Sequence, residues 1–372
     1  MIKVFLIIAL LPILFFSINK FSLRFVNDHT SYQLQHDLNV PVKGTIIPWL
    51  NFDGLNYLDI VEQGYKSNKA LTAFYPLYPL LITIFSLNLK LNPIIIGLLI
   101  SYFSTAFAIV LFYKLSLKAT GSEIDAYKAV VLFALFPASF YLLAYYTEGL
   151  FFLLSVLFFW FLKKESFTLA SFFAIIASAT RLFGLALVGA LIVESYLYFK
   201  KKGKYPFIVF ASPMGFVFYS IYLEINFGNP FLMFFAQSDQ KFGRTLSILS
   251  PLRIVPDTLF KIIQGPQARY DNIFVYPVIL IESFFCAYLI ILLIISFKKI
   301  DLSYWIYLLL SFILIMAGGS LSSVMRYSLA LLPAYFFLSK YLRGLYFVIW
   351  LVISFLLLVF SSSLFLRNYW IA

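Results

Sequence analysis

The stretch YFVIWLVISFLLLVF, residues 346–360, contains no charged side chain and decides the class of fold. Residues 273–297 form a second long apolar run. A strand that crosses a membrane would instead alternate apolar and polar side chains over a short segment. A helix satisfies its backbone hydrogen bonds within one segment, as a lipid environment requires. These runs therefore predict membrane-spanning helices.

The composition of the whole chain leads to the same prediction. Of its 372 residues, 62% are hydrophobic and 12% are charged, and the mean hydropathy is +0.94. A soluble domain has about 25% charged residues. The chain therefore has too little polar material to cover a water-facing surface. We expect an all-α polytopic membrane protein that uses the bilayer as its solvent.

The apolar segments predict where the chain crosses. A helix needs about 20 apolar residues to span the hydrocarbon core. Segments that approach this length lie at 4–18, 93–113, 127–145, 147–163, 167–181, 183–199, 205–223, 273–297, 302–317, 325–340 and 344–366. Several are short, so we expect a bundle of about 10–12 helices that are either transmembrane or re-entrant.

Two segments near the N-terminus need separate treatment. Residues 4–18 follow Lys3, and no small-residue cleavage site comes after them, so we interpret them as an uncleaved first span. Segment 71–90 is apolar but carries Pro76 and Pro79 near its start, and it is expected to insert only partly.

The basic residues predict orientation and exclude nucleic-acid binding. The formal net charge is +12, but the lysines and arginines form no patch. They follow apolar runs, at Lys163–Lys164, Lys200–Lys201–Lys202–Lys204, Lys298–Lys299, and Lys340 with Arg343. This distribution is typical of cytoplasmic loops under the positive-inside rule.

If these basic ends are cytoplasmic, the remaining polar clusters share the opposite face. That face receives loop 19–70, the turn at 145–148, Arg181, loop 224–272 and the turn at 318–325. This assignment of loops to the two sides of the membrane requires residues 71–113 to make one net crossing. Function is therefore expected on this outer face.

The chain is expected to form one domain over residues 1–372. It has no linker, no shift in composition and no internal repeat, and its two long polar loops are 19–70 and 224–272. The single Cys286 cannot form an intrachain disulfide. His29 and His36 have no cysteine nearby, so we predict no metal site.

The first loop carries an acidic cluster that fits a short helix. Helical spacing places Asp53, Asn56, Tyr57 and Ile60 on one face. Asp59, Glu62 and Lys66 fall on another face and are typical of a solvated surface. The Asp53 carboxylate either binds free N–H groups at the helix start or acts as a catalytic base. The spacing leaves both alternatives open.

Further ionisable residues lie at the predicted span ends of the outer face. Glu148 is isolated in apolar sequence and is either functional or placed to complement a helix dipole after Thr147. Arg181 needs an acidic partner, a phosphate or the membrane interface. Other cations on this face are Arg326, beside Tyr327, and the loop residues Lys241 and Arg244. A carboxylate and several arginines on one face suit activation of a hydroxyl and binding of a phosphate.

A set of motifs over residues 50–340 resembles a known family. The motifs are Phe52-Asp53-Gly54 with Tyr57, Ile60 and Gly64-Tyr65; Ala73-Phe74-Tyr75-Pro76-Leu77-Tyr78-Pro79; Phe136-Pro137-Ala138-Ser139 with Tyr146-Thr147-Glu148-Gly149-Leu150-Phe151; Arg181 to Gly184; and Arg326-Tyr327 with Pro333. Their order resembles that of the PIG-V type of GPI mannosyltransferase and its bacterial relatives, within the GT-C class of membrane glycosyltransferases. The chain departs from the family pattern at Phe52, Asn68 and Gly149, where tryptophan, an acidic residue and serine are usual.

The resemblance implies a GT-C-like bundle and a transferase that works on the outer face. It implies an inverting enzyme that takes a hexose, with mannose expected, from a polyprenyl-phosphate or dolichyl-phosphate carrier and needs no cofactor. The acceptor would be a glycan or a glycolipid. The lysine- and isoleucine-rich usage is typical of an AT-rich prokaryote, so a cell-membrane location is expected and the eukaryotic GPI acceptor is not carried over.

The resemblance also assigns roles to residues. Asp53 would be the general base, and Arg181 and Arg326, with Lys241 or Arg244, would bind the donor phosphate. Glu148 would orient sugar hydroxyls or fix an arginine, and Asn56, Tyr57 and Tyr327 would line the substrate site. The rival functions are a polytopic transporter or lipid-glycan flippase, and another membrane transferase such as a glycan ligase or a protein O-mannosyltransferase.

Overall fold

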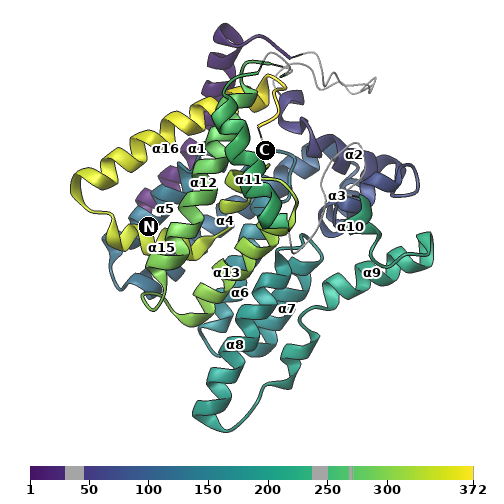
Figure 1. Cartoon of the computed structure of the whole chain (residues 1–372). Coiled ribbons are helices and arrows are strands. Elements are labelled where there is room, and N and C mark those ends of the chain that lie inside the picture. Colours follow the sequence, from purple (N-terminus) through teal and green to yellow (C-terminus); the bar gives the residue numbers. More distant parts are fainter. Residues whose placement is uncertain (30–45, 237–249, 268–269, 271, 372) are drawn as a thin grey trace.

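The computed structural model describes residues 1–29, 46–236, 250–267, 270 and 272–371. Within these residues every regular element is a helix, and the longer helices pack side by side as a bundle (Figure 1). In the described part of the chain, five helical segments are long and apolar enough to cross a membrane. They are α1 (Ile2–Phe25), α4 (Pro93–Thr120), the segment Phe207–Phe227, α12 (Val275–Ser296) and α16 (Gly344–Leu366). These helices confirm the prediction of an all-α polytopic membrane protein.

Shorter apolar helices complete the bundle. They are α3 (Leu77–Leu89), α6 (Glu148–Leu162), α7 (Phe167–Ser178) and α13 (Leu302–Ala317). The bundle also contains α5 (Glu123–Ala134), α8 (Gly184–Lys202) and α9 (Met214–Phe227), the last preceded by a 3-10 turn at Phe207–Ala211. Large apolar side chains point outward from many of these helices, as membrane-facing surfaces require.

Two predicted spans are broken, as the short apolar segments suggested. Segment 127–145 is helical only to Ala134, and Pro137 lies in the turns that follow. Segment 325–340 is divided into α14 (Val324–Ser328) and α15 (Leu332–Tyr341), with Pro333 in the first turn of α15. Proline lacks the N–H that a continuing helix would need, which explains where both interruptions fall.

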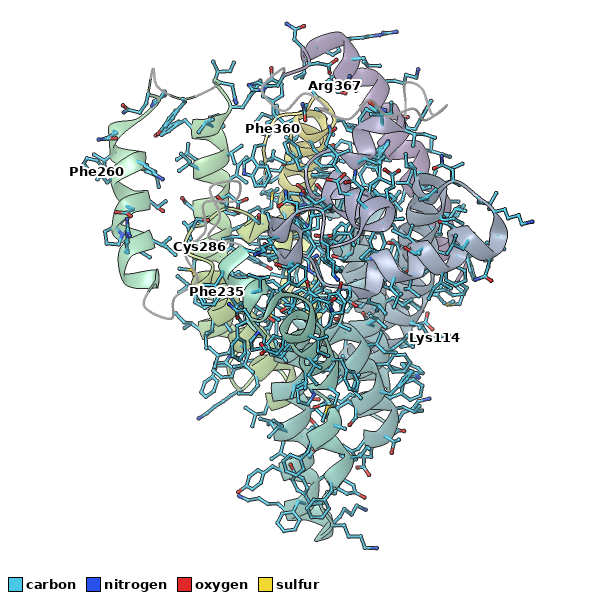
Figure 2. All side chains as sticks on the ribbon, turned by 90° about the vertical axis from the view of Figure 1, so that its right-hand side faces the viewer. Lys114, Phe235, Phe260, Cys286, Phe360 and Arg367 are labelled. Carbon is cyan, nitrogen blue, oxygen red and sulfur yellow. The ribbon has the colours of Figure 1, made fainter. Side chains whose placement is uncertain are left out.

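The two long polar loops contain short helices. The first loop holds the 3-10 helices at Ile47–Leu50 and Lys69–Ala73, and between them α2 (Asp53–Gln63). The second loop contains α10 (Leu232–Ala236) and α11 (Ser250–Gln264). Helix α10 packs on the 3-10 helix Lys69–Ala73 of the first loop. Figure 2 shows α11 on the outside of the bundle beside α12, with Phe260 exposed. The expectation of short helices in the first loop is confirmed.

Helix α4 connects the two ends of the bundle. Near its start, Ser101 donates a hydrogen bond to the carbonyl of Tyr146, and Tyr78 of α3 donates to the carbonyl of Gly97. Near its other end, Lys118 donates to the carbonyl of Lys163, which follows α6. The segment that includes α3 and α4 therefore makes one net passage along the bundle, as the charge pattern requires.

Candidate active site

Asp53 and Arg326 form an ion pair that connects the first loop with the C-terminal part of the chain. Asp53 is the first residue of α2, and Arg326 lies in α14. Nη1 of Arg326 donates to Oδ2 of Asp53 at 2.5 Å. The residue at the N-cap of α2 is Phe52, whose side chain makes no capping hydrogen bond. The Asp53 carboxylate therefore binds a guanidinium instead of the N–H groups of its own helix.

Glu148 lies between two arginines. It is the first residue of α6, and only 3% of its side chain is exposed. Its Oε1 accepts from Nη1 of Arg181 at 2.6 Å and from Nε of Arg326. The other oxygen, Oε2, is buried with no hydrogen-bond partner among the described residues. The role observed for Glu148 in this structure is to hold two guanidinium groups.

Arg181 points into the protein from the turn between α7 and α8. Its Nη1 also donates to the Thr147 hydroxyl at 3.3 Å. The guanidinium lies over the ring of Tyr327, at 5.4 Å from the centroid, and over the ring of Phe183 at 5.9 Å. Only 12% of the side chain is exposed. The structure therefore shows Arg181 paired and mostly buried, and not extended toward the interface.

These four residues form one chain of alternating charge, in the order Asp53, Arg326, Glu148, Arg181. They come from α2, α14, α6 and the α7–α8 turn. Two carboxylates balance two guanidinium groups, so the formal net charge of the network is zero. Such pairing is what makes buried charges tolerable. A negatively charged substrate would therefore meet a site whose arginines are already neutralised by carboxylates.

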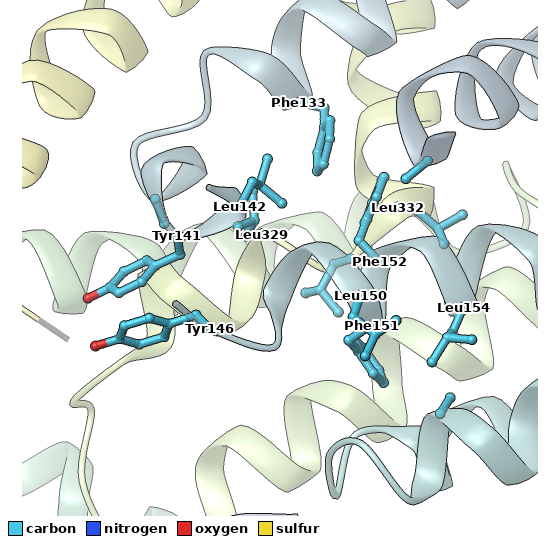
Figure 3. Close-up of a cluster of buried hydrophobic side chains, with 14 of the residues drawn as sticks. Phe133, Tyr141, Leu142, Tyr146, Leu150, Phe151, Phe152, Leu154, Leu329 and Leu332 are labelled. Carbon is cyan, nitrogen blue, oxygen red and sulfur yellow. The ribbon is translucent and has the colours of Figure 1, made fainter. Parts of the chain in front are cut away.

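Two tyrosines support the guanidinium of Arg326. Its centre lies 4.9 Å from the ring centroid of Tyr141 and 4.6 Å from that of Tyr146. Figure 3 shows the two rings side by side at the start of α6, with their hydroxyls pointing the same way. Cation–π contacts of this kind strengthen when water is excluded, and both tyrosines are buried. The rings thus fix the position of Arg326.

The other residues predicted to bind substrate differ in how they contact the four charged residues. Tyr327 packs against the ring of Phe183 in a tilted arrangement and covers Arg181. Asn56 is buried and donates to the carbonyl of Phe52 at 3.4 Å. Tyr57 is buried against Phe74 and Tyr78, and burial raises the pKa of its phenol above the ordinary value, so it stays neutral. The predicted cations Lys241 and Arg244 lie outside the described residues.

Glu282 is a residue that the sequence analysis missed. It lies inside α12, is 3% exposed, and accepts the backbone N–H groups of Ser323 at 3.2 Å and Met325 at 2.8 Å. These groups belong to the start of α14, the helix that carries Arg326. The signal was present, because Glu282 is the one acidic residue in the apolar run 273–297, and an ionisable residue in such a run is a candidate functional residue by default.

Gly149 explains one departure from the family pattern. A Cβ at this position would lie 2.5 Å from the Thr105 hydroxyl and 2.8 Å from the carbonyl of Ser101. Both belong to α4, so only glycine lets the start of α6 approach α4 this closely. That approach places Glu148, the preceding residue, inside the bundle.

Comparison with known proteins identifies a family that covers three of the four residues of this network. A family model described as Mannosyltransferase (PIG-V) matches residues 1–237. The match includes Asp53, Glu148 and Arg181 and ends before Arg326. No curated protein matches the chain.

Among the described residues, no group of three or more histidine, cysteine or acidic side chains could hold a metal ion.

Proposed function

The chain belongs to the PIG-V mannosyltransferase family, and from that premise we propose that it transfers mannose from a polyprenyl-phosphate carrier to a hydroxyl of a glycan or glycolipid. The coarser part of this statement, a membrane glycosyltransferase, follows from the family and from the apolar helices. The donor, the acceptor and the roles of individual residues are the proposal.

The observation that carries the proposal is the position of Asp53. It is the end member of the ionic chain and its side chain is 18% exposed, while Arg326 and Glu148 are 5% and 3% exposed. Arg326 holds Oδ2, which leaves Oδ1 to accept a proton from an acceptor hydroxyl. A general base needs such a fixed orientation within hydrogen-bonding reach of its substrate.

The proposed reaction is a single inverting displacement. The acceptor oxygen forms a bond to the anomeric carbon as its proton passes to Asp53. The bond from that carbon to the phosphate oxygen breaks, and the polyprenyl phosphate leaves with the electron pair. Arg326 uses Nε and Nη1, and Arg181 uses Nη1, for the carboxylates. The remaining N–H groups of both arginines would stabilise the leaving phosphate.

Glu148 has a second task in this proposal. Its buried Oε2 lacks a partner among the described residues, and a buried acceptor of this kind is costly unless a donor reaches it. A hydroxyl of the transferred sugar would supply that donor. The carboxylate would then connect the sugar with both arginines.

The test uses Asp53→Asn, with Glu62→Gln as control. Glu62 lies on the exposed face of the same helix. Purified protein would receive polyprenyl-phosphate mannose with a labelled sugar, and membranes of the natural host would supply the acceptor. We expect Asp53→Asn to lower transfer by about 10²-fold or more, and Glu62→Gln to leave it unchanged.

Two outcomes would overturn the proposal. One is normal transfer by Asp53→Asn. The other is protein-dependent passage of the lipid-linked sugar across liposomes without any glycosidic product, which would indicate a transporter. A parallel reaction with a nucleoside-diphosphate mannose tests the donor, and efficient transfer from it would contradict the polyprenyl-phosphate assignment.

A further inference from the structure

The backbone just before Asp53 is strained. Phe52 has φ 61° and ψ −113°, a conformation that residues with a Cβ rarely adopt and that glycine adopts readily. Strain of this kind persists only where the surrounding contacts over-determine it, and it gathers at functional sites. The strained conformation of Phe52 therefore has to be explained by the contacts that hold it in place.

One hydroxyl bonds to the backbone on both sides of Phe52. Tyr146 donates to the carbonyl of Asn51 at 2.6 Å and accepts from the N–H of Asp53 at 3.1 Å. Tyr146 is 1% exposed, so both bonds are shielded from water. The side chain of Phe52 packs at the same place on Phe365 and Trp370, at centroid distances of 5.9 and 5.1 Å.

We propose that Tyr146 is a positioning residue that holds Phe52 in its strained conformation and thereby aims the Asp53 carboxylate. This inference rests on the proposed role of Asp53 as the general base. Without the hydroxyl, Phe52 would relax toward negative φ, because the bonds from Tyr146 to the Asn51 carbonyl and the Asp53 N–H hold the peptide groups on both sides of that residue. That rotation would turn the start of α2 and move the carboxylate away from Arg326.

The ring of Tyr146 and its hydroxyl act on different members of the site. The ring lies against the guanidinium of Arg326, whereas the hydroxyl holds the backbone that carries Asp53. A phenylalanine at 146 keeps the ring and removes only the hydroxyl. Tyr141 also packs on Arg326, but the hydroxyl that bonds to the Asn51 carbonyl and the Asp53 N–H belongs to Tyr146. Tyr146→Phe therefore isolates the backbone contact.

The first experiment measures transfer by Tyr146→Phe. We expect kcat per folded molecule to fall about tenfold, as the loss of one or two hydrogen bonds at a positioned group would give. The KM for polyprenyl-phosphate mannose should change by less than about twofold, because the donor contacts stay in place. Folded protein is scored by gel filtration and by the thermal unfolding midpoint.

The second experiment tests the strain directly. Phe52→Gly and Phe52→Ala both remove the aromatic ring, but only alanine keeps the Cβ that makes this conformation unfavourable. In the Tyr146→Phe background, glycine at 52 should restore most of kcat, and alanine should not. If Tyr146→Phe folds poorly, the same pair is scored for the yield of folded protein, and glycine should again give the higher yield.

The outcomes separate this inference from the proposed function. Unchanged kcat in Tyr146→Phe overturns the inference, as does equal behaviour of glycine and alanine at 52, which would assign the hydroxyl a role unrelated to strain. Neither result affects the assignment of Asp53, which Asp53→Asn tests by itself. Normal transfer by Asp53→Asn would remove the proposed base, whatever Tyr146→Phe does.

Discussion

Two groups of ion pairs lie at the two ends of α6. Glu148 is the first residue of this 15-residue helix and Lys163 follows its last, so they are separated by about 22 Å at 1.5 Å per residue. Lys163 bonds to Glu194 at 3.1 Å and to Asp301 at 2.9 Å. Nearby helices are joined at the same end by Arg343 and Asp125, at 2.6 and 3.1 Å. By number of ion pairs, the two ends are similar.

The two ends differ in burial and in completeness. At the Lys163 end two of the pairs include a partner open to water, Asp301 at 64% and Arg343 at 56% exposed, and Glu194 in the other Lys163 pair is 25% exposed. At the Glu148 end no member of the network is more than 18% exposed. Glu148 also keeps a buried oxygen without a partner among the described residues. Burial combined with an unmet hydrogen bond distinguishes a candidate site from pairs that only join helices.

The largest difference is expected when one arginine is removed from each end. Arg326→Met leaves Asp53 and Glu148 with one guanidinium between them, and breaking a buried pair this way costs about 3–5 kcal/mol. Arg343→Met should cost about 1 kcal/mol or less, because its side chain is half exposed and Lys128 remains 3.9 Å from Asp125. The free energies of unfolding in detergent measure both, and transfer should be lost only in Arg326→Met. Equal destabilisation would show that burial does not separate the two groups.

A second prediction concerns geometry at constant charge. Arg326 reaches two carboxylates through two nitrogens, and lysine has only one. Arg326→Lys should lower transfer by about 10²-fold, because Asp53 and Glu148 cannot both be held. Arg181 uses a single nitrogen for Glu148 and Thr147, so Arg181→Lys should lose about tenfold. If both lysine variants transfer normally, the planar guanidinium group is not required at either position. That result would also contradict the proposed contacts between the arginines and the donor phosphate.

The third prediction tests the support of Arg326. Glu282→Gln keeps the size of the side chain but replaces one acceptor oxygen with an NH₂ group, which cannot accept from Ser323 or Met325. We expect transfer to fall about tenfold, with the KM for the donor rising as Arg326 becomes less fixed. The matched control is Glu224→Gln, at an exposed position on α9. Equal activity of the two variants would leave Glu282 with a purely structural role.

Local sequence was enough to predict the helices and their interruptions. Apolar runs such as 344–366 and the prolines at 137 and 333 act on nearby backbone, so their effects can be predicted from spacing alone. Short helices in the first loop followed from the pattern around Asp53. The charge pattern at the predicted span ends also predicts Asp53, Glu148, Arg181 and Arg326 on one face, because span ends on one side of a bundle must meet the same surface.

The contacts within that face could not be predicted from the sequence. Asp53 and Arg326 are 273 residues apart, and their pairing depends on how the broken segment around α14 folds back. The helix-cap alternative for Asp53 stayed open because spacing does not show that Phe52 takes the N-cap position. The positive φ of Phe52 left no trace in composition, since aromatic residues give no turn signal.

The smallest effect is expected from Glu194→Gln, at the Lys163 end. Lys163 keeps Asp301 at 2.9 Å and the hydroxyl of Ser303 at 2.9 Å, so the amine is not left unpaired. The Glu194 side chain is 25% exposed, and the lost attraction is therefore screened by water. We expect the free energy of unfolding to fall by less than about 1 kcal/mol, and less at high salt. Transfer should remain within about twofold, since a change of that size in stability leaves nearly all molecules folded. Glu148→Gln makes the same chemical change at the other end of α6, where it removes the one carboxylate that joins both arginines. A salt-insensitive loss of transfer in Glu148→Gln alone would sharpen the contrast, and a matching loss in Glu194→Gln would abolish it.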